Sequence, residues 1–241
     1  MFGKTNLMKY VKYGSIVLVT FVLVAGIAVP MKEGAHGLFE FPVIPGLEQK
    51  ARNIFFHVPV AWTTVVAFLV STYFGLQYLR TRKTEYDIKS VSSAGLGFLF
   101  CFLATVTGSI WAKFNWGSFW NWDPRETSIF ALLLIYGAYF ALRSAIEIEE
   151  VKAKLSAVYS IIAGLTVPFL IFVLPRIMAG LHPGARGDIE GKGPVVEFKM
   201  APNMLVVFFV GLIAFNLLYV WLLDLKIRVG IAEYQQSLQK K

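Results

Sequence analysis

The stretch NMLVVFFVGLIAFNLLYVWLL, from Asn203 to Leu223, contains no charged residue and is long enough to cross a membrane as a helix. About 20 apolar residues, rising ~1.5 Å each, cover the ~30 Å of hydrocarbon in a bilayer. The whole chain has the same character, since 56% of its 241 residues are hydrophobic and only 16% are charged. A soluble domain is nearer to about a quarter charged, so the composition predicts an integral membrane protein.

Five further apolar stretches accompany this one. Together they predict an all-α, polytopic membrane protein that forms a single domain, 1–241, with six transmembrane helices. The predicted spans are residues 13–29, 58–79, 91–111, 126–143, 155–174 and 203–223. The basic start of the first span is also compatible with a signal peptide, so cleavage of that span stays open as an alternative.

The 23 Lys and Arg residues fall unequally on the two sides that these spans define, fourteen on one side and nine on the other. The richer side is cytoplasmic by the positive-inside rule, so we expect both termini inside, an N-in/C-in topology. The net charge of +8 comes from residues that flank apolar runs and form no patch, which favours lipid over nucleic acid as the partner.

Two functional classes are disfavoured by residues that the chain lacks. The interiors of the predicted spans contain no Asp, Glu, Lys, Arg or His, whereas ion-coupled transporters need ionisable groups there. The single cysteine, Cys101, lies in an apolar run and is expected to be a buried hydrophobe. No CxxC or CxxCH motif exists, so thiol exchange and covalent haem attachment are both disfavoured.

With both termini inside, three loops face outward, and we expect the chemistry to lie there. They comprise about residues 30–57, 112–127 and 175–202, and they contain all three histidines, His36, His57 and His182. The middle loop carries the run WGSFWNWDPRET, from Trp116 to Thr127.

The tryptophans of this run have two readings. A belt of interfacial aromatics is common in membrane proteins, but it usually needs fewer rings than the four found between Trp111 and Trp122. The alternative is a stacking surface for a large flat ligand, made of Trp116, Trp120 and Trp122. Because Trp116 and Trp120 are four residues apart, a helical turn would put them on one face.

The end of the run predicts the start of the fourth helix. Asp123 suits the N-cap, Pro124 the first helical position, and Glu126 the return contact of a capping box. Arg125 is either an interfacial anchor or a partner for an anionic group such as a haem propionate.

His57 and His182 are candidate metal ligands that the fold would have to bring together. His57 precedes Val58-Pro59, a dipeptide that we expect to be extended at Val58 and to begin the helix at Pro59. Two imidazoles, an aromatic platform and an arginine suit haem, whose iron commonly takes histidine ligands. Zinc is disfavoured because the outer loops offer neither HExxH nor cysteine, and His36 is expected to be solvated.

At this point the chain resembles a known family. The pattern from Trp116 to Thr127 is similar to the WWD signature of the haem-handling proteins of cytochrome c biogenesis, and within them to the haem exporter protein C (CcmC) branch. HVPVAW, starting at His57, and GLHPG, which contains His182, are similar to that branch's two histidine motifs. The resemblance covers about residues 55–184.

The resemblance implies a haem delivery protein rather than an enzyme. His57 and His182 would be the axial ligands of haem b, bound transiently and without covalent attachment. Trp116, Trp120, Trp122, Asp123 and Arg125 would form the rest of the site, on the periplasmic face of a bacterial inner membrane. The haem would pass to a CcmE-like chaperone, in a complex with ABC transporter subunits (CcmA/CcmB-like) and a small CcmD-like subunit.

One departure keeps alternatives open. The segment WDPRET is similar to the WDPKET form of the CcsA branch, a cytochrome c synthetase subunit with more spans and a second histidine pair inside the membrane. This chain has three histidines and none within a predicted span. A synthetase subunit of the CcsA kind and a haem-free membrane docking subunit are therefore the competing functions.

Overall fold

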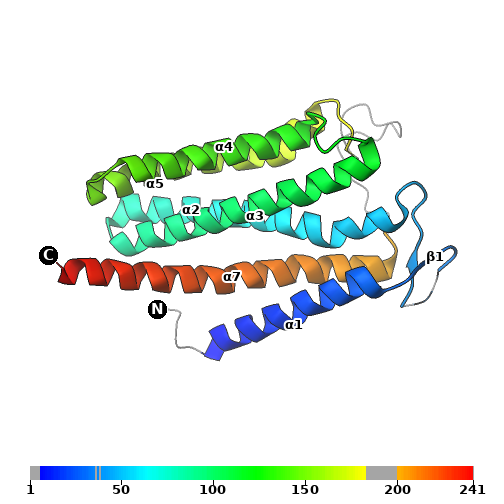
Figure 1. Cartoon of the computed structure of the whole chain (residues 1–241). Helices are drawn as coiled ribbons and strands as arrows, with labels where there is room; N and C mark the ends of the chain where they lie inside the picture. The colour runs from blue at the N-terminus through cyan, green and yellow to red at the C-terminus, as the bar shows by residue number, and fades with distance from the viewer. Residues whose placement is uncertain (1–5, 36, 38, 183–199, 241) are drawn as a thin grey trace.

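The computed structural model describes residues 6–35, 37, 39–182 and 200–240, so His36 lies outside the described residues. The chain folds into long helices stacked in three layers, α4 with α5, α2 with α3, and α1 with α7 (Figure 1). The main helices are α1 (Asn6–Ala28), α2 (Ile54–Thr81), α3 (Thr84–Trp116), α4 (Pro124–Ala145), α5 (Glu149–Pro168) and α7 (Pro202–Gln239). Shorter elements are β1 (Met31–Lys32), β2 (Phe41–Pro42), the 3₁₀ helix η1 (Glu48–Asn53), the π-helix η2 (Phe169–Val173) and α6 (Leu174–Ile177).

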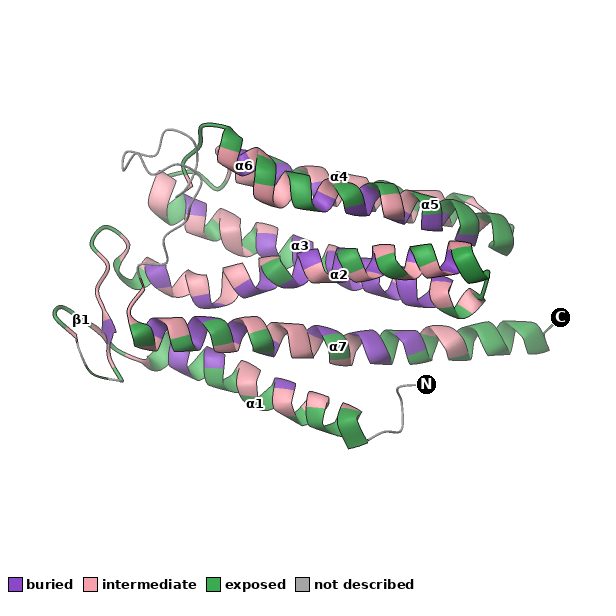
Figure 2. Cartoon of the chain, turned by 180° about the vertical axis from the view of Figure 1, so that it is seen from behind, coloured by how far each residue is buried: buried purple, intermediate pink, exposed green. Residues whose placement is uncertain are grey.

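Six helical stretches among the described residues are long and apolar enough to cross a membrane. The prediction of an all-α, polytopic membrane protein is therefore confirmed. Figure 2 shows buried residues gathered where the three layers meet, while exposed residues cover the outward sides of α1 and α4. The start of α1 and the end of α7 lie at one end of the bundle, and β1 lies at the other (Figure 1).

Small residues let α2 approach its neighbours closely. Gly164 of α5 lies against Thr72 of α2 without room for a side chain between them. The Thr72 hydroxyl donates to the carbonyl oxygen of Ser160 at 3.0 Å, which links the two helices. Close backbone approach and hydroxyl bonds are the usual means of joining helices in a bilayer, because lipid is as apolar as a leucine side chain.

The start of α2 differs from the prediction. Val58 is helical and Pro59 lies inside the helix, which begins at Ile54 and follows directly on η1. Proline has no N–H group, so the helix lacks the hydrogen bond that residue 59 would donate to the Phe55 carbonyl oxygen. Gly211 of α7 packs closely on this carbonyl oxygen and on the Pro59 ring, since a Cβ at Gly211 would lie 3.2 Å from each of them. The predicted extended geometry at Val58 is wrong because packing on α7 stabilises the helical turn, and His57 consequently belongs to the helix.

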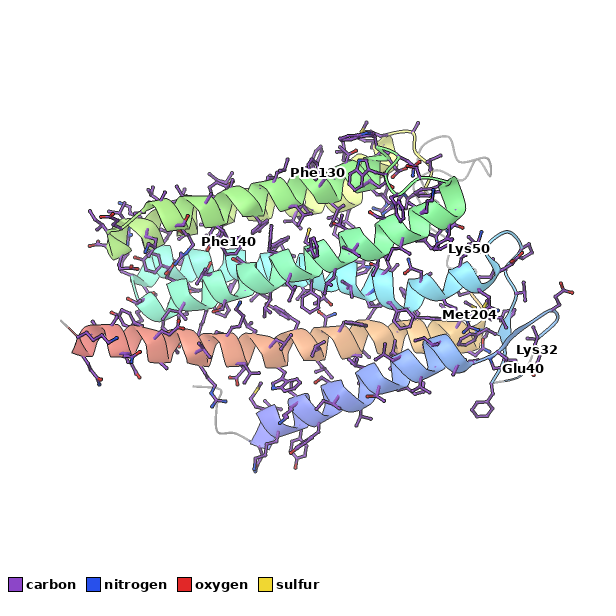
Figure 3. The ribbon with its side chains drawn as sticks, in the orientation of Figure 1. Lys32, Glu40, Lys50, Phe130, Phe140 and Met204 are labelled. Carbon is purple, nitrogen blue, oxygen red and sulfur yellow. The ribbon has the colours of Figure 1, made fainter. Side chains whose placement is uncertain are left out.

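The other helix ends are tied by polar contacts. Arg143 of α4 makes two bonds to the Asp87 carboxylate of α3, at 2.7 and 2.9 Å, at the end of the bundle away from β1. At the β1 end, Lys32 pairs with Glu40 across the outer loop, as Figure 3 shows. In the same region Met204 of α7 is buried in an apolar cluster that joins α1, α2 and α7.

Candidate functional site

His57 projects from the first turn of α2 toward α3. Its Nδ1 lies 3.0 Å from the hydroxyl oxygen of Thr107. That hydroxyl donates its own proton to the Leu103 carbonyl oxygen at 2.9 Å, so it accepts from Nδ1–H. Nε2 of His57 is then the nitrogen with a lone pair available to a metal, the usual arrangement for a ligating histidine whose other nitrogen is fixed by a hydrogen bond.

A glycine makes room for the His57 ring. A Cβ at Gly108 would lie only 2.9 Å from Cε1 of His57, closer than ordinary contacts allow. The imidazole therefore packs against the bare backbone of α3 at this position. Neither Thr107 nor Gly108 was identified from the sequence, because their neighbours do not distinguish them from other small residues of an apolar helix.

His182 is held by Asp123. Its Nδ1 lies 2.6 Å from Oδ1 of the aspartate, which is only 4% exposed. Burial alone would raise the pKa of Asp123, but the His182 hydrogen bond and charge and two backbone N–H donors lower it to about 2. The carboxylate is therefore ionised at neutral pH and accepts from Nδ1–H, which leaves Nε2 of His182 available to a metal.

Asp123 also starts helix α4, as predicted. Its Oδ1 accepts from the backbone N–H of Arg125 at 2.9 Å, and Glu126 completes the capping box. Its Oδ2 accepts from the backbone N–H of Leu181 at 2.6 Å. A Cβ at Gly180 would lie 2.7 Å from Oδ2, so a glycine is needed for this close approach. One carboxylate thus fixes both the fourth helix and the segment that carries His182.

Two tryptophans of α3 enclose the His182 ring. Trp116 meets it edge to face at a centroid distance of 4.6 Å, and Trp111 lies nearly parallel to it at 6.1 Å. The two indoles also contact each other at 4.9 Å. Trp111 was not among the predicted site residues, although its position five residues before Trp116 in the same helix was a usable signal.

The other two tryptophans of the outer loop form a separate pair. Trp120 and Trp122 meet edge to face at 5.9 Å, and Trp120 packs on Phe130 of α4, labelled in Figure 3. Trp122 has a positive φ of 57° and is 69% exposed. Helix α3 ends at Trp116, and Gly117 follows with φ 81°. The prediction that Trp116 and Trp120 share a helical face is therefore wrong.

Helix α3 connects the two histidines. Thr107 contacts His57 and Trp111 contacts His182, and these two residues are one helical turn apart, about 6 Å along the axis. The electrostatic influence of His182 reaches His57 as well. Two imidazoles separated by 125 positions in the chain are thus gathered at one end of the bundle, as the sequence predicted.

Arg125 lies on the first turn of α4, half-buried, and its charge reaches His57. Within the described part of the chain, its guanidinium has no hydrogen-bond or ion-pair partner. The site thus combines two imidazoles whose Nε2 atoms are available, an aromatic enclosure and a cation without a counter-ion. Groups of these kinds can bind an iron porphyrin with carboxylate side chains.

Comparison with known proteins identifies the family of the chain. Residues 6–241 match the family model of CcmC, heme exporter protein C. Heme exporter protein C of Bradyrhizobium diazoefficiens is 29% identical over 191 residues, 78% of this chain and 70% of the relative. That of Rhodobacter capsulatus is 28% identical over 200 residues, 81% of this chain and 78% of the relative.

A shorter similarity extends to the second branch. Cytochrome c biogenesis protein CcsA of Gossypium barbadense is 37% identical over 92 residues, 37% of this chain and 29% of the relative. The family match, by contrast, covers all but the first five residues. The chain therefore belongs to the haem exporter protein C (CcmC) family.

Proposed function

We propose that this protein binds haem b between His57 and His182 and delivers it for cytochrome c maturation. The observation that carries the proposal is that both imidazole rings are held through the same nitrogen atom. Each Nδ1 is fixed, by the Thr107 hydroxyl or by the Asp123 carboxylate, so each Nε2 is left for iron. Haem supplies the iron that accepts the two nitrogens, and the names of the relatives support haem as the cargo.

The two ligands differ in how they are held, which suits delivery. His57 belongs to a long helix, whereas His182 follows α6 on a segment without helical structure and is fixed mainly by Asp123 and two indoles. Ligand exchange with a receiving protein needs one bond to break while the other holds. His182 is accordingly the ligand that yields, and His57 is the one that retains the iron.

The proposed location is the outer face of a bacterial inner membrane. The excess of Lys and Arg on the other side favours an N-in/C-in topology, and the site then faces the periplasm. The receiver is a membrane-anchored, CcmE-like haem chaperone. The assembly also contains ABC transporter subunits of the CcmA/CcmB kind and a small CcmD-like subunit, and the protein itself carries out no covalent step.

The test measures the haem content of the purified protein and then the transfer of that haem to a chaperone. Protein purified in detergent from haem-replete cells should give the pyridine haemochrome spectrum of haem b and should lose that haem to a purified CcmE-like chaperone. A haem-free preparation that still binds its partners would contradict the proposal and favour a docking subunit.

A synthetase role is the second candidate, because the match to a CcsA protein covers 92 residues of this chain. It predicts mature cytochrome c when this chain is expressed with a haem-lyase partner and without any haem chaperone. Haem delivery predicts no product under those conditions.

A further inference from the structure

The end of helix α1 is bound by a cation from the segment that leads into α2. Nη1 of Arg52 donates to the Gly26 carbonyl oxygen at 2.9 Å, and Nη2 donates to the Val29 carbonyl oxygen at 2.8 Å. Nε donates to Oε1 of Gln49 at 2.6 Å, which fixes the plane of the guanidinium. The last carbonyls of a helix lack partners within it and favour a positive charge. Helix α1, which is described throughout, has no basic residue in its last turn, so Arg52 supplies that charge.

The helical turn that follows Arg52 packs on the same point of α1. Arg52 belongs to η1, and α2 follows directly, with His57 in its first turn. A Cβ at Gly26 would lie 2.8 Å from Cζ of Phe56 and 3.3 Å from Cδ2 of Phe55, so both rings lie against the bare backbone of α1. Gly26 is thus held through its carbonyl oxygen by Arg52 and through its Cα by the two residues before His57.

The same turn is also held by α3. The His57 ring binds the Thr107 hydroxyl and packs on Gly108. The side-chain amide of Asn53, the residue before α2, donates to the Thr107 carbonyl oxygen at 3.5 Å. Helices α1 and α3 belong to different layers of the bundle (Figure 1), so the turn that carries His57 is held from two directions.

We propose that Arg52 is a positioning residue for His57, an inference that rests on the proposed haem function. By binding the end of α1, Arg52 fixes the turn of α2 that aims the imidazole at the iron. A guanidinium suits this task because its planar fork binds two carbonyl oxygens at once. Helix α1 thereby supports the ligand that retains the iron during delivery.

The test asks which of the two iron ligands depends on Arg52. Arg52→Gln is introduced into His182→Gly and into His57→Gly, each loaded with haem in detergent with free imidazole as the second iron ligand. Haem release to apomyoglobin is followed by visible absorbance. In His182→Gly, where His57 is the remaining protein ligand, Arg52→Gln should speed release about tenfold. In His57→Gly it should leave the rate unchanged.

Two further variants separate the bonds from the charge. Lys50→Gln is the matched control, since Lys50 is a cation of the same η1 helix (Figure 3) and its side chain bonds no residue of the described chain. It should leave both release rates unchanged. Arg52→Lys keeps the charge but loses the planar fork, so it should restore only part of the slow release in His182→Gly.

Hydrogen exchange of the haem-free proteins gives a readout that does not depend on haem. In otherwise wild-type protein, Arg52→Gln should speed exchange of the backbone amides of residues 53–57, because the turn has lost its bonds to α1. Residues 123–127, at the start of α4, should exchange at the wild-type rate.

Equal acceleration of haem release in both backgrounds would overturn the inference, because Arg52 would then act on the stability of the whole fold. Unchanged release in His182→Gly, or unchanged exchange in residues 53–57, would overturn it too. In these cases wild type that carries histidine-ligated haem would leave the proposed haem function standing. Wild type that takes up no haem would instead refute the haem function, and the exchange rates would still decide whether Arg52 holds the turn.

Discussion

The carboxylate of Asp123 and the imidazole of His182 are joined by a 2.6 Å bond across 59 positions of the chain. The same carboxylate caps α4. The acid of the WWD signature therefore places His182, the proposed iron ligand, and starts the helix that ends the tryptophan loop. Substitution can separate these two tasks.

Asp123→Asn should preserve stability better than Asp123→Ala. An amide oxygen can still cap Arg125 N–H, whereas alanine cannot and costs about 1 kcal/mol of unfolding free energy. Both variants should bind haem more weakly, because one amide oxygen cannot serve Arg125, Leu181 and His182 together. Thermal melting and haem titration measure the two effects; wild-type haem affinity in Asp123→Asn would show that the carboxylate is needed only as a cap.

Thr107→Val should weaken haem binding about tenfold without changing the fold. Valine keeps the shape of threonine but removes the oxygen that accepts from Nδ1–H of His57. The control is Thr105→Val, two residues earlier on α3, whose hydroxyl bonds the Cys101 carbonyl of its own helix. If both variants bind haem as wild type does, the hydrogen bond to Thr107 does not orient the ligand.

Gly108→Ala should displace the His57 ring and lower haem affinity, since the added Cβ would lie 2.9 Å from Cε1. Gly137→Ala is its control, because a Cβ there meets no atom within 4 Å. In the helical Gly137 position alanine should raise stability by up to about 1 kcal/mol. Absorbance spectra of the two proteins at equal haem loading test the difference; identical spectra would refute the tight fit at His57.

Trp111→Leu should release haem faster than Trp120→Leu. Trp111 lies against His182, while Trp120 contacts Trp122 and Phe130 on the other side of the loop. An aromatic contact contributes about 0.5–1.5 kcal/mol beyond burial, which corresponds to a loss of roughly two- to tenfold. Haem transfer to apomyoglobin gives the release rates. Equal rates would mean that the stacking surface extends over the whole loop.

The sequence predicted the elements better than their contacts. Long apolar runs identified the six spans, and local capping rules identified Asp123 as the start of α4. Pro59 misled the prediction for α2, because its lost hydrogen bond is tolerated where Gly211 packs against it. Helix α3 continues past its apolar run to Trp116, since the last turns are fixed by contacts with the two histidines.

The partners of the histidines could not be predicted from local patterns. Thr107 is 50 positions from His57, and only the packing of α2 on α3 brings them together. Long-range pairs of this kind depend on the crossing of helices, which one sequence does not specify.

The most direct measurement of the central claim is the absorption spectrum of haem bound to His57→Gly and His182→Gly, before and after imidazole is added. Wild type should give the low-spin spectrum of two imidazole ligands. Each variant should lose that spectrum and regain it with free imidazole, while His36→Gly should match wild type throughout. An unchanged low-spin spectrum in either His57→Gly or His182→Gly would contradict the account, because that histidine would then not be an iron ligand.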